Sequence, residues 1–224
     1  HGAEVVALQH RREPRQRLLG GHRAPRDRRH LGGHLAVLLG LLLGRHLLRA
    51  ADRGVRVRIL VDDVNFEDRD ANLASFDAHP NIEVRLFNPF VQRNAKTLDF
   101  LTDFERVNHR MHNKLMVVDN AVAIVGGRNM SDPYFGVNAT QNFRDLDVVA
   151  VGPVVRELSK VYDRFWNGDW AVPIAACVDR PYGMDDYTLT AKAVRDSIAA
   201  SSYPWPLERD VAELERELEA LYSA

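Results

Sequence analysis

The chain has 224 residues, 46% of them hydrophobic, which is enough for one α/β domain with an appended segment. Its single cysteine, Cys177, excludes an internal disulfide. The net charge of −1 is unevenly spread, with ten arginines and three acidic residues in residues 1–50. The remainder has 20 basic and 28 acidic residues, a poor electrostatic match for nucleic acid, which we do not expect as a partner.

Residues 1–46 differ in composition from the rest of the chain. They consist mainly of Arg, His, Leu and Gly, and no helical or strand period persists before Leu31. Two interpretations remain open: a disordered basic arm that contacts anionic lipid headgroups, or an out-of-frame stretch that joins the authentic sequence near Gly44. A composition that fits no globular, linker or targeting class favours the second interpretation.

The apolar run at residues 35–43 is the strongest hydrophobic stretch of this segment. Its nine residues fall far short of the roughly 20 that a membrane-spanning helix needs. We therefore expect no transmembrane segment.

From residue 42 onward, helical and strand patterns alternate. A mixed sheet flanked by helices, which is an α/β fold, is the architecture that such alternation predicts. The expected helices are 42–52, 71–78, 98–107 and 154–166, and the expected strands are 55–63, 82–88, 115–118, 121–125 and 147–151.

After residue 170 the pattern changes, and we expect residues 171–224 to form a linker and amphipathic helices, a C-terminal helical extension of a domain at 47–170. One helix is expected near 189–200. The last segment carries an apolar stripe that packs on its own domain, contacts a second chain or docks against a missing half. The stripe consists of Leu207, Val211, Leu214, Leu218 and Leu221.

The segment RMHNKLMVVDNAVAIVGGRN, residues 110–129, holds the candidate functional residues in the pattern H-x-K-x4-D-x6-G-G-x-N. At background residue frequencies this pattern arises by chance at fewer than roughly one start position in a million. Because alternate side chains of a strand share a face, His112 and Lys114 point the same way. An imidazole that attacks phosphorus or transfers a proton, beside a cation that holds the non-bridging oxygens, suits a phosphodiester substrate.

The other positions of the pattern fit the same kind of substrate. Asp119 closes the strand, where it braces either the lysine or the turn. Gly126 and Gly127 let the backbone pass close to a bound anion, to which Asn129 offers an amide donor. The His and Asp positions form no compact set of metal ligands, so we expect no metal and no other cofactor.

The motif resembles the HKD signature of the phospholipase D superfamily. Together with NIEVRLFNPF at 81–90 and FRDLDVVAVGPV at 143–154, it is similar to bacterial cardiolipin synthases and related phospholipase D-like proteins. The resemblance implies that His112 is the nucleophile that forms a phosphohistidine intermediate. It also implies that Lys114 and Asn129 hold the phosphate, and that Asp119 supports the geometry of the motif.

In such relatives an acidic residue on a later strand orients the histidine. Asp147 occupies the matching place, with Asp145 as the alternative. Relatives also place two such motifs face to face, whereas this chain has one, because His79 and His109 lack the following Lys and Asp. The resemblance therefore predicts a half-enzyme that pairs with a missing second motif or with a second chain.

The resemblance makes phosphatidyl transfer the expected reaction, most simply cardiolipin synthesis from phosphatidylglycerol or a similar phospholipid. It also predicts peripheral contact with the membrane surface on the cytoplasmic side of the inner membrane. Two alternatives stay open: a homodimeric single-motif phosphodiesterase or nuclease, and an inactive fragment. Relatives place their first strand and helix within residues 1–46, so an out-of-frame stretch there would leave the sheet with an unpaired edge.

Overall fold

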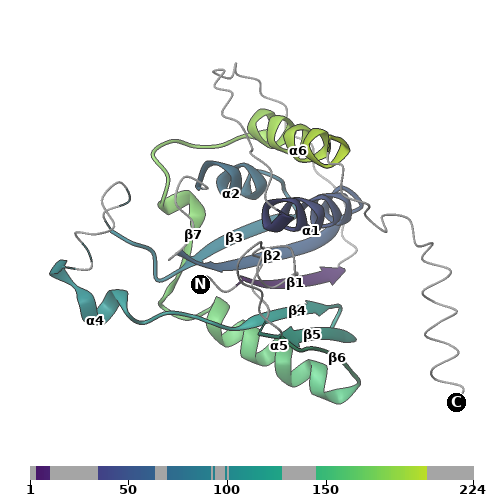
Figure 1. The fold of residues 1–224 in the computed structure, drawn as a ribbon, viewed down its shortest axis with the longest axis vertical. Helices are drawn as coiled ribbons and strands as arrows, with labels where there is room; N and C mark the ends of the chain where they lie inside the picture. The colour runs from purple at the N-terminus through teal and green to yellow at the C-terminus, as the bar shows by residue number, and fades with distance from the viewer. Residues whose placement is uncertain are drawn as a thin grey trace, which may run out of the picture.

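The computed structural model describes residues 4–10, 35–63, 70–91, 93, 99, 101–127 and 145–200, with side chains described from residue 43 onward. A seven-stranded sheet forms its centre, in the order β6-β5-β4-β1-β2-β3-β7 (Figure 1). The strands are β1 (Glu4–His10), β2 (Val55–Asp62), β3 (Ile82–Phe87), β4 (Lys114–Val118), β5 (Val122–Gly126), β6 (Asp147–Val151) and β7 (Ala171–Pro173).

The sheet is mixed. β2 and β3 are parallel to each other, as are β1 and β4, and the remaining pairs are antiparallel. The α/β fold with a mixed sheet predicted from the sequence is therefore confirmed. These directions bring the ends of β2, β3 and β5 together with the starts of β4, β6 and β7. We name this end of the sheet, at which residues 112–114 lie, the motif end.

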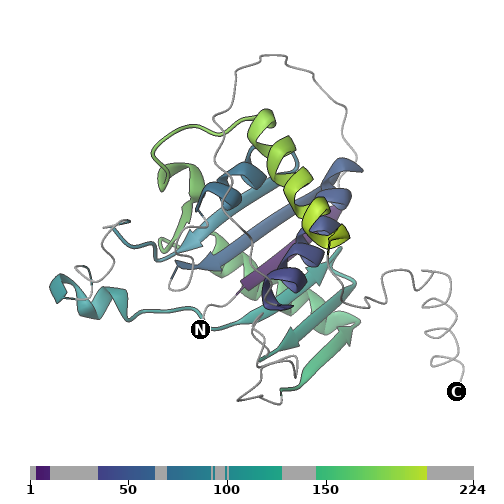
Figure 2. The same cartoon turned by 45° about the horizontal axis from the view of Figure 1, so that its top comes forward.

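Helices cover both faces of the sheet (Figures 1 and 2). α1 (Leu35–Asp52), α2 (Asp70–Asp77) and α6 (Met184–Ala199) lie on one face, and α5 (Pro153–Trp166) lies on the other. Strand side chains alternate between two buried clusters, as a period of two requires. The cluster under α1, α2 and α6 contains Val57, Ile59, Val61, Ile82, Val84 and Leu86; the cluster over α5 contains Leu60, Phe87, Leu115, Val117 and Ala123.

The structure differs from the sequence prediction at both ends of the chain. Residues 4–10, for which we expect no strand, form β1 at the centre of the sheet, so the predicted unpaired edge is wrong for this structure. Helix α1 begins at Leu35 rather than at residue 42. The helix predicted near 189–200 is present as α6, which begins earlier, at Met184, and packs on α1, whereas β7, which joins the sheet, was not predicted. The apolar stripe at 207–221 lies outside the described residues.

The predicted helix at 98–107 is interrupted: residues 99, 101 and 102 are helical, and the short helix α4 (Phe104–Val107) follows after a break at Asp103. Asp103, directly before it, has a φ of −147°, which is incompatible with a helix that continues through this position. α4 projects from the motif end of the sheet, at the left of Figure 1. The segment that leads to the motif is therefore a projection rather than one long helix.

Candidate active site

His112 and Lys114 lie together at the start of β4. Lys114 Nζ is 3.0 Å from His112 Nε2 and donates to the His112 carbonyl oxygen, also at 3.0 Å. The imidazole is exposed, and the lysine is half-buried. The structure therefore brings together the two groups that strand periodicity places on one face.

The geometry of this contact suits one tautomer of the imidazole. An ammonium group has no lone pair, so Lys114 in its charged form can only donate to Nε2, and a ring that accepts at Nε2 carries its proton on Nδ1. Burial lowers the pKa of Lys114, and the negative charge of Asp145 opposes this shift. The site thus places an imidazole nitrogen beside a lysine whose charge is stabilised by a nearby carboxylate.

Across the sheet, Lys114, Gly126 and Asp147 form one row. Lys114 is paired with Gly126 on β5, and Gly126 is paired with Asp147 on β6. Directly opposed residues of antiparallel strands point to the same face, so Lys114 and Asp147 share a face. A Cβ at position 126 would lie 1.9 Å from Asp147 Oδ1 and 2.8 Å from Asp147 Cγ. The absence of a side chain at Gly126 therefore makes room for the carboxylate of Asp147.

Gly127 has the same relation to Asp145. A Cβ at position 127 would lie 2.6 Å from one carboxylate oxygen of Asp145 and 2.7 Å from the other. The sequence predicts a glycine pair that lets the backbone approach an anion. In the structure, the glycine pair accommodates two carboxylates of the chain itself.

Asp119 lies at the other end of β4, in the turn to β5. Asp119 and Asn120 have φ values of 50° and 56°, and the Ala121 amide donates to the Val118 carbonyl at 2.9 Å. At about 3.3 Å per residue, five residues of strand separate Asp119 from Lys114 by roughly 16 Å. Of the two positions that the sequence left open, the structure places Asp119 in the turn and not beside the lysine.

The turn is also connected to helix α5. The hydroxyl group of Ser159 donates to Asn120 Oδ1 at 2.5 Å and to the Val155 carbonyl at 3.0 Å. Asn129, predicted to bind the phosphate, lies outside the described residues.

A buried polar framework, which the sequence analysis did not identify, holds the approach to His112. Asp62, at the end of β2, is 1% exposed and accepts from the Met111 amide at 2.7 Å and from Arg110 Nη1 at 3.2 Å. Asn88, after β3, donates to the carbonyl groups of Arg106 and His109, both at 2.8 Å. A signal for this framework exists in the sequence, because polar residues follow two buried strands at positions 62 and 88.

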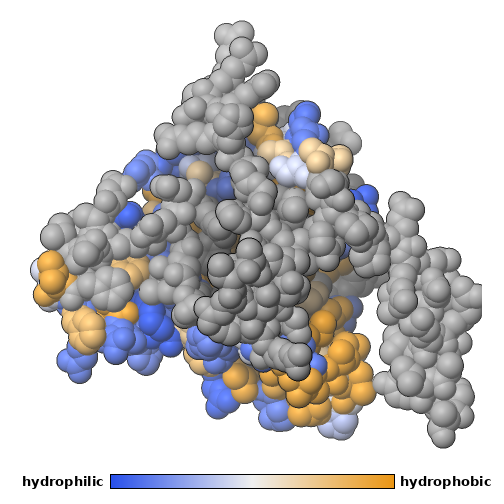
Figure 3. All heavy atoms as spheres, viewed as in Figure 1, coloured by the Kyte–Doolittle hydropathy of each residue, from blue (hydrophilic) through white to orange (hydrophobic). Residues whose placement is uncertain are grey.

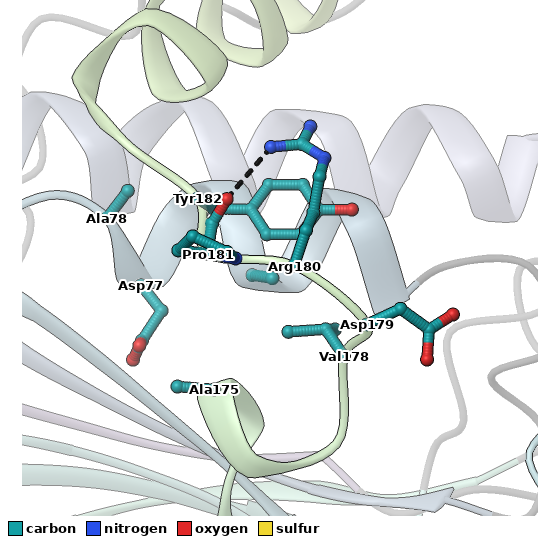
Figure 4. A pocket seen from close by; sticks show the side chains of 9 residues that line it. Asp77, Ala78, Ala175, Val178, Asp179, Arg180, Pro181 and Tyr182 are labelled. Carbon is teal, nitrogen blue, oxygen red and sulfur yellow. Dashed lines mark hydrogen bonds between the residues drawn. The ribbon is translucent and has the colours of Figure 1, made fainter.

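Other features of the described residues do not add to the site. None of their His, Cys, Asp and Glu side chains form a group of three that could hold a metal ion. No helix among them is long and apolar enough to cross a membrane. A cavity of about 400 Å³ lies between α2 and the segment 175–182, far along the chain from the motif (Figure 4). In this cavity the Arg180 guanidinium stacks on the Tyr182 ring at 3.9 Å, and no motif residue lines it.

The chain resembles several bacterial proteins. Over 144 residues (64% of this chain and 30% of the relative) it is 49% identical to cardiolipin synthase C of Escherichia coli. It is 40% identical over 136 residues to an uncharacterized protein of Helicobacter pylori (60% of this chain, 27% of that protein). It is 34% identical over 130 residues to a cardiolipin synthase of Geobacillus kaustophilus (57% of this chain, 24% of that protein).

The chain therefore spans less than a third of the length of these relatives. No solved structure significantly matches it. The family described as "Cardiolipin synthase, PLD-like domain" matches residues 41–166, which is more than half of the 224 residues. The chain belongs to this family of cardiolipin synthase phospholipase D-like domains.

Proposed function

We propose that this chain carries one catalytic half of a phosphatidyltransferase, with His112 as the nucleophile. The observation that carries the proposal is the 3.0 Å contact between Lys114 Nζ and His112 Nε2. This contact supports the proposal, because an imidazole nitrogen that accepts from a neighbouring ammonium is unprotonated, as attack on an anionic phosphodiester requires.

In the first step, His112 Nε2 attacks phosphorus, a P–N bond forms, and the bond from phosphorus to the alcohol oxygen breaks. Lys114 turns from the imidazole to the non-bridging oxygens, and Asn129 provides a further donor to them. The departing alkoxide takes a proton from a general acid on a second motif, which we place on a missing half or a second chain. In the second step, the deprotonated group of the second motif takes a proton from a hydroxyl group of a phosphatidylglycerol-like acceptor, or from water. The oxygen attacks phosphorus, a P–O bond forms, and the P–N bond breaks, which releases His112.

A carboxylate at the start of β6 or just before it orients the imidazole in this proposal. An acceptor for the Nδ1–H of His112 holds the tautomer that leaves Nε2 unprotonated, and it stabilises the imidazolium formed later. The position of Asp147 in the row of Lys114 and Gly126 supports it for this role. The electrostatic influence of Asp145 on Lys114 makes Asp145 an equal candidate. Asp119 supports the turn of the motif hairpin.

The test uses a leaving group that needs no general acid, so that the chain can be assayed without a second motif. We expect phosphatidyl-p-nitrophenol in detergent micelles to release a burst of one equivalent of p-nitrophenol and to leave an acid-labile adduct on the protein. His112→Ala should abolish both, and Lys114→Ala should slow the burst by about 10²-fold or more. His46→Ala, at another exposed histidine, is the matched control and should leave the burst unchanged.

The same assay separates the alternatives. Discharge of the adduct by phosphatidylglycerol identifies a transferase, whereas discharge by water alone identifies a hydrolase. Faster turnover of a nucleotide p-nitrophenyl diester than of the lipid would favour a phosphodiesterase acting on nucleic acid. A burst that persists in His112→Ala would disprove the proposed mechanism.

A further inference from the structure

The motif end of the sheet exposes apolar side chains from four separate segments of the chain. Leu101 is 79% exposed and Phe104 is 61% exposed on the projection that includes α4. Val91, after β3, is 73% exposed; Leu146, before β6, is 75% exposed; and Trp170, before β7, is 39% exposed. Figure 3 shows the apolar surface at the position of α4, at the left of the view. Large apolar side chains gathered at one end of a protein mark an interaction surface.

Hydrogen bonds connect the projection that includes α4 to the segment that follows β3. The Asn88 side chain, which is 2% exposed, donates to the carbonyl group of Arg106 within α4 and to that of His109, two residues after the helix ends. Asp99 accepts from the Val91 amide at 2.6 Å, which ties the two parts of this loop together. The apolar side chains of the projection are thus held at a defined position relative to His112, eight residues after Phe104.

Trp170 is held by aromatic contacts. The His109 ring lies 4.8 Å from the Trp170 ring and 6.0 Å from the Phe87 ring, so His109 connects the start of β7 with the segment that leads to the motif. Tryptophan side chains gather where a protein meets the headgroup region of a bilayer, because one part of the ring is apolar and one part is polar.

The described arginines of this end are held by carboxylates of the same chain. Arg93 contacts Asp63 and Asp70, Arg106 contacts Asp103 at 2.5 Å, and Arg110 contacts Asp62 at 3.2 Å. These arginines are therefore poorly placed to attract anionic headgroups, and attraction to a bilayer must come mainly from apolar contact.

We propose that the motif end is a membrane-docking surface, in which Leu101 and Phe104 enter the bilayer and Val91, Leu146 and Trp170 contact its headgroup region. This inference rests on the proposed function, because a phospholipid phosphodiester lies at the bilayer surface and His112 reaches it only if this end faces the lipid. A bilayer fits this surface because Trp170 lies at it, as tryptophan does where a protein meets lipid headgroups, and because the proposed substrate of the adjacent His112 is a lipid.

The experiment measures insertion directly. Because Cys177 is the only cysteine, Cys177→Ser allows a polarity-sensitive fluorophore to be attached at Leu101→Cys or Phe104→Cys. The control position is Val154→Cys, which is 51% exposed at the opposite end of the sheet. Neutral phosphatidylcholine vesicles in 0.5 M NaCl suppress electrostatic binding by the arginine-rich residues 1–50.

We expect the fluorophore at positions 101 and 104 to brighten severalfold with these vesicles, and the fluorophore at position 154 to change little. In the unlabelled chain, Leu101→Ser and Phe104→Ser should each lower the vesicle partition coefficient about tenfold, whereas Val154→Ser should not. Both residues are exposed, so a thermal melt should find these variants as stable as the parent.

Two results would overturn the proposal. One is an unchanged signal at positions 101 and 104; the other is brightening that depends on protein concentration without vesicles, which would assign the surface to a second copy of the chain. His112→Ala separates this inference from the proposed function, because it should abolish the p-nitrophenol burst and leave the vesicle response intact.

Discussion

At the scale of single residues, the charge on Lys114, which lies beside His112, is stabilised by Asp145, two residues before β6. Burial lowers the pKa of Lys114, and Asp145 counteracts this shift by stabilising the ammonium. Lys114 must be protonated to hold a phosphate oxygen, and it loses its proton as the pH rises through this lowered pKa. The glycine pair is part of the same arrangement, because it leaves space for Asp147 and Asp145 close to the lysine.

We therefore predict that Asp145→Asn lowers the pKa of Lys114 further. The alkaline limb of the proposed activity should then move to lower pH, because the ammonium is lost earlier. Reductive ¹³C-methylation and NMR titration can follow the lysine, with Lys114→Arg to assign its signal. Asp147→Asn is the matched control, since Asp147 does not contribute to the pKa shift of Lys114. An equal or larger shift in Asp147→Asn would contradict the assignment of Asp145 as the charge that acts on the lysine.

At the scale of elements, helix α5 buries one face of the sheet through aromatic side chains. Tyr162 and Trp166 are 1% and 3% exposed, and the Arg58 guanidinium lies 4.8 Å and 5.3 Å from their ring centroids. Asp163 fixes the Arg58 side chain by an ion pair at 2.9 Å. Among the described residues, the buried Tyr162 hydroxyl has no hydrogen-bond partner. The helix thus gains stability from the aromatic ring and loses some from the hydroxyl group.

Removing this hydroxyl should be neutral or stabilising. We predict that Tyr162→Phe changes the free energy of unfolding by between zero and about +1 kcal/mol, whereas Tyr162→Ala lowers it by about 3–5 kcal/mol through loss of the ring. Burial also raises the pKa of Tyr162 above its ordinary value of 10.0, so its stability contribution is complete below pH 10.0 and is lost above it as the unfolded state ionises.

Urea unfolding at pH 8 and above pH 10 measures both effects. The parent chain should lose more stability between the two pH values than Tyr162→Phe does. A clear loss of stability in Tyr162→Phe at pH 8 would mean that the hydroxyl group has a partner in the folded chain.

At the scale of the whole molecule, one contact joins segments that lie far apart in the sequence. Asp52, at the end of α1, accepts from the Tyr187 hydroxyl at 3.1 Å and lies 3.5 Å from His79 Nε2. The ring centroids of His79 and Tyr187 are 4.8 Å apart, and the backbone amide of Asn81 donates to His79 Nδ1 at 3.1 Å. This cluster fixes α6 to α1 and to the turn between α2 and β3, and so includes residues 184–199 in the domain.

The buried histidine makes this junction sensitive to acid. Burial lowers the pKa of His79 below its ordinary value of 6.5, although Asp52 opposes the shift. The unfolded chain therefore binds a proton before the folded chain does, and stability should fall as the pH drops below 6.5 towards the lowered pKa.

We predict that His79→Asn, which keeps an acceptor for the backbone amide of Asn81, loses less stability than the parent between pH 7 and pH 5. Chemical denaturation across this range, followed by circular dichroism, provides the measurement. His109→Asn, at an exposed histidine, is the control and should retain the acid sensitivity of the parent. If His79→Asn loses as much stability at pH 5 as the parent does, the acid sensitivity belongs to other groups than His79.

Local patterns in the sequence were sufficient for part of this architecture. β2, β3, β6 and α5 lie within one or two residues of their predicted bounds, because each has a clear hydrophobic period and a Gly, Pro or Asn at its boundary. β1 and β7 were not predicted, since neither short strand has a period that separates it from loop. The helix predicted at 98–107 is helical at residues 99, 101, 102 and 104–107 but is broken at Asp103, and no Gly or Pro at this position marks the break in the sequence.

The amino-acid sequence by itself predicted that the His112 and Lys114 side chains lie together, because the two residues are close in one segment; in the structure Lys114 begins β4 and His112 lies two residues before it. Only the tertiary structure decided that Gly126 and Gly127 accommodate Asp147 and Asp145, that Asp62 and Asn88 hold the approach to the motif, and that the apolar side chains gather at the same end of the sheet. These relations depend on strand order and register, which are set by contacts between residues far apart in the chain.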